Sequence, residues 1–287
     1  MYSLNQIETV GVVGAGVMGA GIAQLAAQAG YAVLLYDHDA SMLPRARQQM
    51  EKNLDGAVQR QKMTAAEKDR ILDAVQTTHQ LDAVRASFII EAVVEKLDVK
   101  VQLFRQLAAQ NGPQAILATN TSSIPISRMA RETPQPERVV GMHFFNPAHI
   151  MKLVEVIRGA ATDQQVAAVA FELAEKMGKK PVYAADSAGF IVNRVARPFY
   201  VEGLKAVEDG ITDLETMDQL MEAHGFKMGP FRLMDLIGVD ANFNVTQSMY
   251  ESFWQESRFR PSRMQQQKVD AGHHGRKTGR GFYHYDD

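Results

Sequence analysis

The chain of 287 residues contains no cysteine, which excludes disulfide bonds, thiolate metal sites and cysteine nucleophiles. It also lacks an apolar run long enough to cross a membrane. The formal net charge is only −2, so no excess of basic residues points to nucleic acid or to an anionic membrane surface. The first apolar strand is expected from about Ile7, which leaves no room for a leader peptide. We therefore expect a cytoplasmic protein that binds neither nucleic acid nor membranes.

A glycine-rich turn follows the first apolar run of the chain and opens a predicted helix. The turn and its first helical residues are Gly14, Gly16, Val17, Met18 and Gly19. Of the three glycines, which fit the pattern G-x-G-x-x-G, the first allows a tight turn and the second lets a pyrophosphate approach the backbone. The third lets the helix pack on the strand, and the helix N-terminus offers N–H groups to an anion. The turn predicts a dinucleotide site, although a turn used only for packing is the alternative.

An acidic residue ends the second predicted strand, 31–36. This residue, Asp37, lies roughly 20 residues beyond the glycine turn, as the dinucleotide pattern requires. A carboxylate at this point accepts hydrogen bonds from a ribose diol and repels a 2′-phosphate. The sequence therefore predicts NAD rather than NADP as the cofactor.

Strand and helix signals alternate through the first two thirds of the chain. Such alternation predicts a mainly parallel sheet covered by helices on both faces, a Rossmann-type doubly wound α/β fold. After the glycine-turn helix, 17–29, further strands are expected at 88–92, 116–119, 139–143, 153–157 and 181–184, and a helix at 163–177. Two charged, amphipathic stretches, 41–61 and 64–75, are predicted to project as a helical arm over about residues 41–76.

The pattern changes at residues 186–189, beyond which strand signals are absent. We predict two domains: residues 1–185 with the sheet and arm, and residues 186–287 as an all-α domain. Asp186 or Ser187 is expected to cap the helix that carries Asn193. Clefts between domains are common places for a binding site. Methionines of the second domain, together with Phe253 and Trp254, are expected to fill its core or an interface.

Seven short segments recur in order along the chain and carry a family resemblance. They are Gly14–Gly19, Glu91–Lys96, Asn120–Ser123, His143–Pro147, Met151–Val156, Gly189–Arg194 and Gly279–Tyr283. On these segments the chain resembles the L-3-hydroxyacyl-CoA dehydrogenase family over nearly its whole length. It is most similar to the branch that oxidises 3-hydroxyadipyl-CoA in bacterial phenylacetate breakdown, and to 3-hydroxybutyryl-CoA dehydrogenases. The resemblance implies reversible NAD-dependent oxidation of (S)-3-hydroxyacyl-CoA by a homodimer formed through the C-terminal domains.

Four residues are candidates for the chemistry. His143 ends an apolar strand, and an imidazole, which titrates near neutral pH, suits proton transfer from an alcohol. Glu155 lies on the neighbouring predicted strand, where its carboxylate can fix the tautomer of the ring. Ser122 and Asn193 offer hydrogen bonds to substrate oxygens. The resemblance implies the base, its partner and these two oxygen contacts, whereas a core histidine, a surface glutamate and a turn serine are the alternatives.

Further candidates are expected to contact the nicotinamide of NAD or the phosphates of CoA. The resemblance places near the nicotinamide the residues Ala92, Glu95, Lys100, Asn120 and Asn146, together with Ser122. A surface ion pair and ordinary turn asparagines are the alternatives there. On the helical arm, Asn53, Arg60 and Lys62 are expected to meet CoA, since a guanidinium binds phosphate oxygens through two N–H groups. A solvated basic helix face is the alternative.

Two other functions remain open at this stage. A related NAD-dependent dehydrogenase of a sugar acid such as gulonate would keep the fold without a need for the basic arm. A non-catalytic NAD-binding protein, like the lens crystallins derived from this family, would more plausibly have lost its histidine. We expect no metal site. For a substrate with a distal carboxylate, a cation is expected in the second domain, and Arg197 and Arg232 are the candidates.

Overall fold

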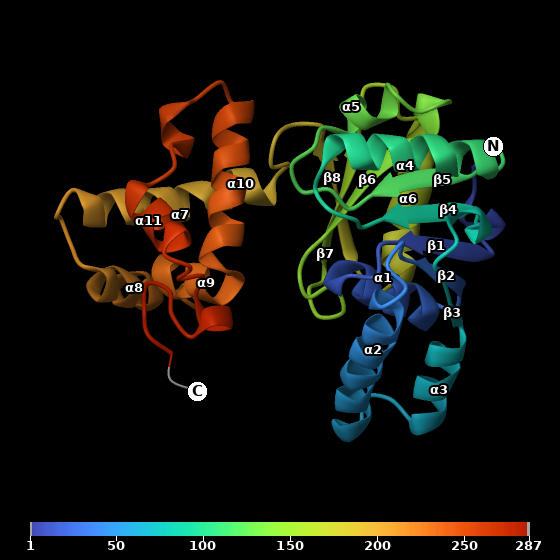
Figure 1. The fold of residues 1–287 in the computed structure, drawn as a ribbon, viewed down its shortest axis with the longest axis horizontal. Helices are drawn as coiled ribbons and strands as arrows, with labels where there is room; N and C mark the ends of the chain where they lie inside the picture. Colours follow the sequence, from blue (N-terminus) through green and yellow to red (C-terminus); the bar gives the residue numbers. More distant parts are fainter. Residues whose placement is uncertain (1, 286–287) are drawn as a thin grey trace. The chain divides into compact units, whose positions relative to one another are not determined.

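The computed structural model describes residues 2–285 and divides into two compact units, Met1–Ser187 and Ala188–Asp287. The first unit is built around one sheet, and the second consists of helices (Figure 1). This confirms the predicted fold class, a doubly wound α/β domain followed by a helical domain.

The sheet of the first unit has the strand order β3-β2-β1-β4-β5-β6-β7-β8. Its strands are β1 Thr9–Val13, β2 Ala32–Tyr36, β3 Val75–Thr78, β4 Phe88–Glu91, β5 Ile116–Thr119, β6 Val139–Phe144, β7 Leu153–Arg158 and β8 Lys180–Ala185. All neighbouring strands pair in parallel except β6 and β7, which are antiparallel. Chain order reverses between β1 and β4, and ligands of such sheets bind at this switch, beyond the carboxyl ends of the strands.

Helices cover both faces of the sheet because the strands are apolar on both sides. The helices of this unit are α1 Val17–Gln28, α2 Met42–Gln59, α3 Ala65–Asp73, α4 Leu97–Gln110, α5 Ile126–Ala130 and α6 Gln164–Lys176. Phe88 and Ile90 of β4 join the apolar core that includes residues of α1 and α6. The intervening Ile89 is also buried, on the opposite face, since side chains alternate along a strand.

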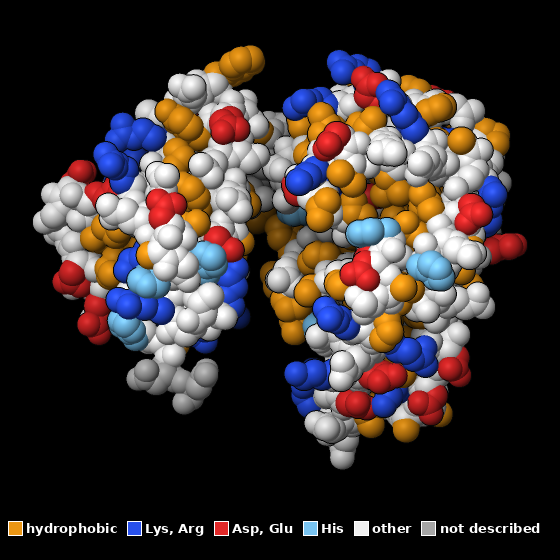
Figure 2. Space-filling view, in the orientation of Figure 1, with side chains coloured by type: hydrophobic (Ala, Val, Ile, Leu, Met, Phe, Trp, Pro, Cys, Tyr) orange, Lys and Arg blue, Asp and Glu red, His pale blue; other side chains and the backbone are white. Residues whose placement is uncertain are grey.

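The helical arm consists of α2 and α3, which extend from the sheet unit (Figure 1). Its inner side packs through Met50 and Leu54, both buried, whereas side chains of both charges cover its surface (Figure 2). A capping box of Thr64 and Glu67 begins α3. The sequence missed the edge strand β3, since residues 75–78 are mostly polar and directly follow a helical pattern.

The second unit contains α7 Val192–Glu208, α8 Leu214–Ala223, α9 Pro230–Ile237, α10 Val239–Ser252 and α11 Arg263–Asp270. Its core includes Phe231, Met234 and Phe282. Trp254, which was expected to fill the core or an interface, is 94% exposed and lies outside the core of the single chain. Phe253 does pack, against Phe259.

The expected cap of α7 by Asp186 or Ser187 is wrong, since its N-cap residue is Ile191, whose side chain makes no capping hydrogen bond. The carboxylate of Asp186 accepts hydrogen bonds from the backbone N–H groups of Ile126 and Ser127, at 2.7 and 2.8 Å, and from the Ser127 hydroxyl. It therefore caps α5 of the first unit, about 60 residues earlier in the chain. Sequence proximity favoured the nearer helix, whereas the fold brings the N-terminus of α5 to this carboxylate.

Candidate active site

The glycine turn between β1 and α1 has the geometry that a pyrophosphate requires. Gly14 has a φ of +105°, which disfavours residues with a side chain. A Cβ atom at Gly19 would lie 1.6 Å from the Gly14 carbonyl oxygen, so this position must be glycine for the helix to pack. A Cβ at Gly16 would meet nothing within 4 Å, so the backbone is open to a ligand there. The turn fits NAD.

Asp37 follows β2 and is nearly buried. Its Oδ2 accepts a hydrogen bond of 2.7 Å from the Ala15 N–H, and its Oδ1 accepts one of 3.0 Å from the Asp39 N–H. The carboxylate thus fixes the glycine turn to the end of β2. Oδ1 also lies 3.2 Å from His38 Nδ1, whereas Oδ2 keeps a second acceptor site, so binding of a ribose hydroxyl is compatible with these contacts.

His143 and Glu155 lie directly opposite each other on the antiparallel strands β6 and β7. The imidazole Nδ1 is 2.7 Å from Glu155 Oε2, and the two side chains are 7% and 0% exposed. The Phe145 ring packs beside the imidazole, with ring centroids 4.5 Å apart. Burial strengthens this contact and restricts the ring to one orientation. The strands that the sequence predicted as neighbours therefore bring an oriented histidine to the carboxyl end of β6.

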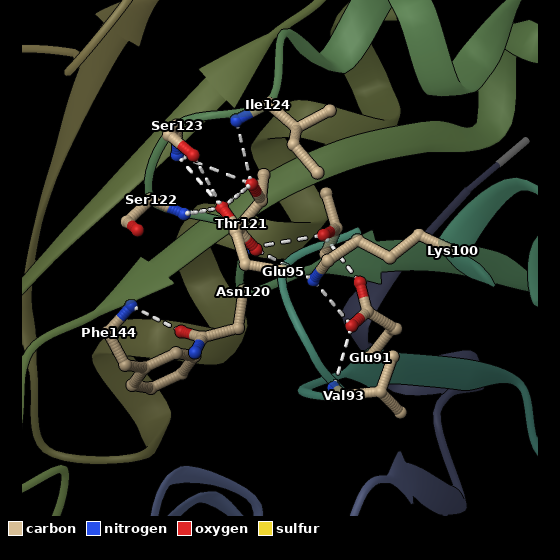
Figure 3. A network of polar contacts seen from close by, with 11 residues as sticks. Glu91, Val93, Glu95, Lys100, Asn120, Thr121, Ser122, Ser123, Ile124 and Phe144 are labelled. Carbon is tan, nitrogen blue, oxygen red and sulfur yellow. Dashed lines mark hydrogen bonds and ion pairs between the residues drawn. The ribbon is translucent and has the colours of Figure 1, made fainter. Parts of the chain in front are cut away.

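The loop after β5 is held by a single carboxylate, that of Glu95 (Figure 3). Glu95 Oε1 accepts hydrogen bonds from the backbone N–H groups of Ser122 and Ser123, at 3.0 and 3.1 Å. It also accepts from the hydroxyls of Thr121 and Ser123, at 2.5 and 2.9 Å. Several charge-assisted hydrogen bonds to one oxygen fix the backbone on which the Ser122 side chain stands. Desolvation acts to raise the pKa of Glu95, but the Lys100 ammonium and the hydroxyls of Thr121 and Ser123 together bring it below its ordinary value.

A second carboxylate lies deeper in the same network. The Lys100 ammonium is 2.6 Å from Glu91 Oε1 and 3.1 Å from Glu95 Oε2, and the Lys100 and Glu91 side chains are 1% and 0% exposed. Glu91 also accepts hydrogen bonds from the Thr119 hydroxyl and the Val93 N–H, both at 2.7 Å. Desolvation raises the pKa of Glu91, although the neighbouring ammonium opposes this rise. Lys100 is thus buried between two carboxylates.

Asn120 joins this loop to the strand of the histidine. Its Oδ1 accepts a hydrogen bond of 2.8 Å from the backbone N–H of Phe144, next to His143 (Figure 3). Ala92 lies beside the glycine turn, where its N–H donates to the Val13 carbonyl at 2.7 Å. Asn146 is exposed in the loop after β6.

Of the arm residues expected to meet CoA, Asn53 lies within α2, whereas Arg60 and Lys62 follow its C-terminal end. The Asn53 amide nitrogen donates to Gln24 Oε1 of α1 at 3.1 Å and lies 3.5 Å from His149 Nδ1. The Arg60 guanidinium lies over Gly56, where an added Cβ would be 3.3 Å from Nη2. Arg60 and Lys62 are both exposed. Desolvation lowers the pKa of His149, and Lys179 and Arg60 lower it further.

Asn193 belongs to the second unit, where it is the second residue of α7 and half-buried. Its Oδ1 is 3.4 Å from Nη2 of Arg197, one turn further along the helix. Gly189 and Phe190 precede the helix with φ angles of +71° and +48°, so the chain turns sharply just before it.

Sequence reasoning missed the part that Glu91 plays in the site. A glutamate inside an otherwise apolar strand, Phe88–Glu91, is the signal that could have identified it, because a buried charge requires a partner. Lys100, which the resemblance places near the nicotinamide together with Glu95, lies between the carboxylates of Glu91 and Glu95.

Comparisons with known proteins agree with this geometry. Residues 9–187 match the family model "3-hydroxyacyl-CoA dehydrogenase, NAD binding domain", and residues 189–285 match the C-terminal domain of the same family. No helix of the described residues is long and apolar enough to cross a membrane.

Curated relatives match the chain over nearly its full length. A 3-hydroxyadipyl-CoA dehydrogenase of Escherichia coli is 48% identical over 96% of this chain, which spans 59% of that protein. A 3-hydroxybutyryl-CoA dehydrogenase of Mycobacterium tuberculosis is 40% identical, with 98% of this chain and 99% of the relative covered.

A solved structure has the same fold throughout. The crystal structure of (S)-3-hydroxybutyryl-CoA dehydrogenase from Ralstonia eutropha superposes with a TM-score of 0.94 at 36% identity, covering 98% of this chain and all of the other. With both family models matched in order over residues 9–285, the chain belongs to the 3-hydroxyacyl-CoA dehydrogenase family and carries that family's NAD-binding domain.

Proposed function

We propose that the chain catalyses the reversible, NAD-dependent oxidation of (S)-3-hydroxyacyl-CoA thioesters to 3-oxoacyl-CoA. The observation that carries this proposal is the contact of 2.7 Å between His143 Nδ1 and Glu155 Oε2, at the sheet edge that also presents the glycine turn. The names of the relatives support the substrate class, and 3-hydroxybutyryl-CoA and 3-hydroxyadipyl-CoA are the two leading candidates.

His143 acts as the general base. Because Nδ1 faces Glu155, the hydroxyl proton of the substrate goes to Nε2. The Glu155 carboxylate holds the required tautomer and stabilises the imidazolium that forms, as the aspartate does in serine-protease triads. Ser122 and Asn193 bind the 3-oxygen and the thioester carbonyl, which orients C3.

Cofactor binding uses the loops at the carboxyl ends of the strands. Bound NAD supplies the acceptor for the hydride from C3. The glycine turn, with Val17 and Met18 at the start of α1, holds the pyrophosphate, and Asp37 binds the ribose. Close to the nicotinamide we place the residues Ala92, Glu95, Asn120, Ser122 and Asn146, with Lys100 acting through Glu95.

CoA binding involves the arm. Asn53 is held in place by Gln24, and Arg60 and Lys62 offer exposed positive charge to phosphates. A free sugar acid such as gulonate would make no use of these residues, and the family match favours neither this substrate nor a non-catalytic protein.

The proposed function can be tested by comparing the rate of NADH oxidation with acetoacetyl-CoA and with a free keto-acid. A faster rate with the free acid would contradict the proposal, and no rate with either would indicate a non-catalytic protein.

We also propose a homodimer formed through the second unit and a location in the cytoplasm. The apolar side chains exposed on this unit support the first point: Ile211 is 76%, Leu220 58% and Trp254 94% exposed. The absence of cysteine supports the second. Light scattering at micromolar concentration should report twice the mass of one chain, and a fully active monomer would contradict the dimer.

A further inference from the structure

Arg197 of α7 carries a buried charge without an acidic partner. The residue is 2% exposed, and its Nη1 donates to the Asn242 carbonyl at 3.2 Å and to the Thr246 hydroxyl at 3.0 Å. Nη2 reaches only Asn193 Oδ1, at 3.4 Å, and Nε has no hydrogen-bond partner. Within residues 2–285 no carboxylate lies at ion-pair distance from this guanidinium. Desolvation lowers the pKa of Arg197 to about 10.

The vacant donors of Arg197 lie on one side of the guanidinium. Nη1 is occupied by α10, whereas Nε has no partner and the Nη2 contact is longer than the 2.7–2.9 Å typical of charge-assisted hydrogen bonds. Nε and Nη2 form one of the two-pronged edges by which a guanidinium binds a carboxylate. This edge lies toward Asn193, which is half-buried, whereas Asn242 and Thr246 are buried.

Another buried arginine, Arg138, also has an Nε without a hydrogen-bond partner, but its other donors meet a different surrounding. Arg138 of the first unit is 1% exposed and donates to the carbonyls of Ala108 and Gly112, at 2.9 and 2.7 Å. These carbonyls lie at the C-terminal end of α4, where the helix dipole favours a cation. Arg197 instead contacts the first two turns of α10, which offer no such negative end.

Arg232, the other cation expected to meet a distal carboxylate, already has acidic partners. Its Nη1 is 3.0 Å from Glu222 Oε1, and its Nε is 4.0 Å from Asp218 Oδ2. Of the two arginines considered for such a role, only Arg197 therefore has donors left over and no carboxylate partner; its guanidinium also lies over the Tyr200 ring, 5.1 Å from the ring centroid.

We propose that Arg197 is a specificity-determining residue that binds the distal carboxylate of a dicarboxylic acyl-CoA substrate such as 3-hydroxyadipyl-CoA. This inference rests on the proposed function, in which Asn193 binds an oxygen near C3. Residues four apart on a helix lie about 5–6 Å from each other. In an adipyl chain, three carbon–carbon bonds separate C3 from the carboxyl carbon, roughly 4 Å when extended. A six-carbon diacid can therefore reach Arg197 while its 3-oxygen remains at Asn193.

A matched pair of substrates tests this proposal. 3-Hydroxyadipyl-CoA and 3-hydroxyhexanoyl-CoA have six carbons each and differ only in a terminal carboxylate or methyl group. In Arg197→Met, kcat/KM for the adipyl substrate should fall about 10- to 150-fold, the loss expected for hydrogen bonds to a charge, with less than about a threefold change for the hexanoyl substrate. Arg197→Lys keeps the charge but loses the two-pronged edge. Its kcat/KM for the adipyl substrate should therefore lie between those of the wild type and Arg197→Met. Arg232→Met is the matched control and should leave the ratio of the two substrates unchanged.

A parallel loss with both substrates would overturn the proposal and make Arg197 a structural link between α7 and α10. The Asn242 carbonyl also accepts the Thr246 hydroxyl at 3.0 Å, so it keeps a partner in Arg197→Met. Should that variant not fold, the wild-type enzyme still decides: adipyl-CoA should inhibit at least tenfold more tightly than hexanoyl-CoA, and equal inhibition overturns the proposal. If the wild type oxidises neither substrate, the proposed function itself fails.

Discussion

In the sheet unit Lys100 and His143 contact buried carboxylates, whereas in the helical unit the buried aspartates are bound mainly by backbone N–H groups and tyrosine hydroxyls. Lys100 lies between Glu91 and Glu95, and His143 faces Glu155 at 2.7 Å. All of these side chains lie at or near the carboxyl ends of β4, β5 and β6. Charge pairing there holds an imidazole and a loop in fixed positions, as the proposed catalysis requires.

The aspartates of the helical unit serve the fold instead. Asp235 accepts hydrogen bonds from the N–H groups of Phe282 and Tyr283, at 2.9 and 3.0 Å, and from the Tyr285 hydroxyl. This fastens the C-terminal segment to α9. Burial and the carboxylate of Asp235 together raise the pKa of Tyr285 to about 12. The comparison teaches that loss of a charge should impair the chemistry in one unit and the stability in the other.

The largest effect is expected from His143→Gln. Loss of a general base slows the chemical step by about 10²- to 10⁴-fold, while NADH binding should survive. Stopped-flow kinetics with acetoacetyl-CoA and a fluorescence titration with NADH measure the two effects. His79→Gln, on an exposed histidine of the same unit, is the control. An active His143→Gln enzyme would contradict the assignment of the base.

The substitution Asp235→Asn tests whether a buried aspartate of the helical unit contributes to stability. An amide places N–H donors against the backbone N–H groups that the carboxylate now accepts, so we expect a loss of about 2–4 kcal/mol in the free energy of unfolding. Urea unfolding of the full chain measures this loss. Asp209→Asn, an exposed aspartate of the same unit, should change it by less than about 0.5 kcal/mol. Unchanged stability in Asp235→Asn would show that the C-terminal segment is held by other contacts.

Local sequence signals predicted the fold well where they were strong. The buried strands β4 and β5 are continuous apolar runs, and the glycine turn fixes where β1 ends and α1 begins. The edge strand β3 was missed because only one of its four residues is buried. The cap of α5 by Asp186 depends on residues about 60 positions apart, which no local pattern reveals.

The candidate site was predictable in its residue types but less so in its contacts. His143 and Glu155 could be paired from two adjacent predicted strands. In contrast, the four hydrogen bonds that Glu95 accepts from residues 121–123 depend on a loop 26 or more residues away.

The substitution Glu95→Gln tests whether the hydrogen bonds to the Glu95 carboxylate affect catalysis by positioning Ser122. We expect kcat to fall about tenfold, because the amide weakens charge-assisted hydrogen bonds to the loop and loses the Lys100 pair. If Glu95 positions Ser122, Glu95→Gln should lower kcat little further in an enzyme that already carries Ser122→Ala, since the two effects are then not additive. Glu8→Gln, on an exposed glutamate, is the control. Additive losses, or a weakened NADH affinity of the same size, would indicate direct contact with the cofactor instead.

The smallest effect is expected from Arg60→Met on the arm. An exposed charge contributes about 0.2–1 kcal/mol, so KM for an acyl-CoA should rise only about 1.5- to 5-fold with kcat unchanged. High salt should abolish the difference, because it screens exposed charges. A pantetheine thioester lacks the phosphates of the nucleotide and should show no difference between variant and wild type. Arg45→Met, in the first turn of α2, is the matched control. An equal rise in KM for the pantetheine substrate would mean that Arg60 shapes the arm rather than binds phosphate.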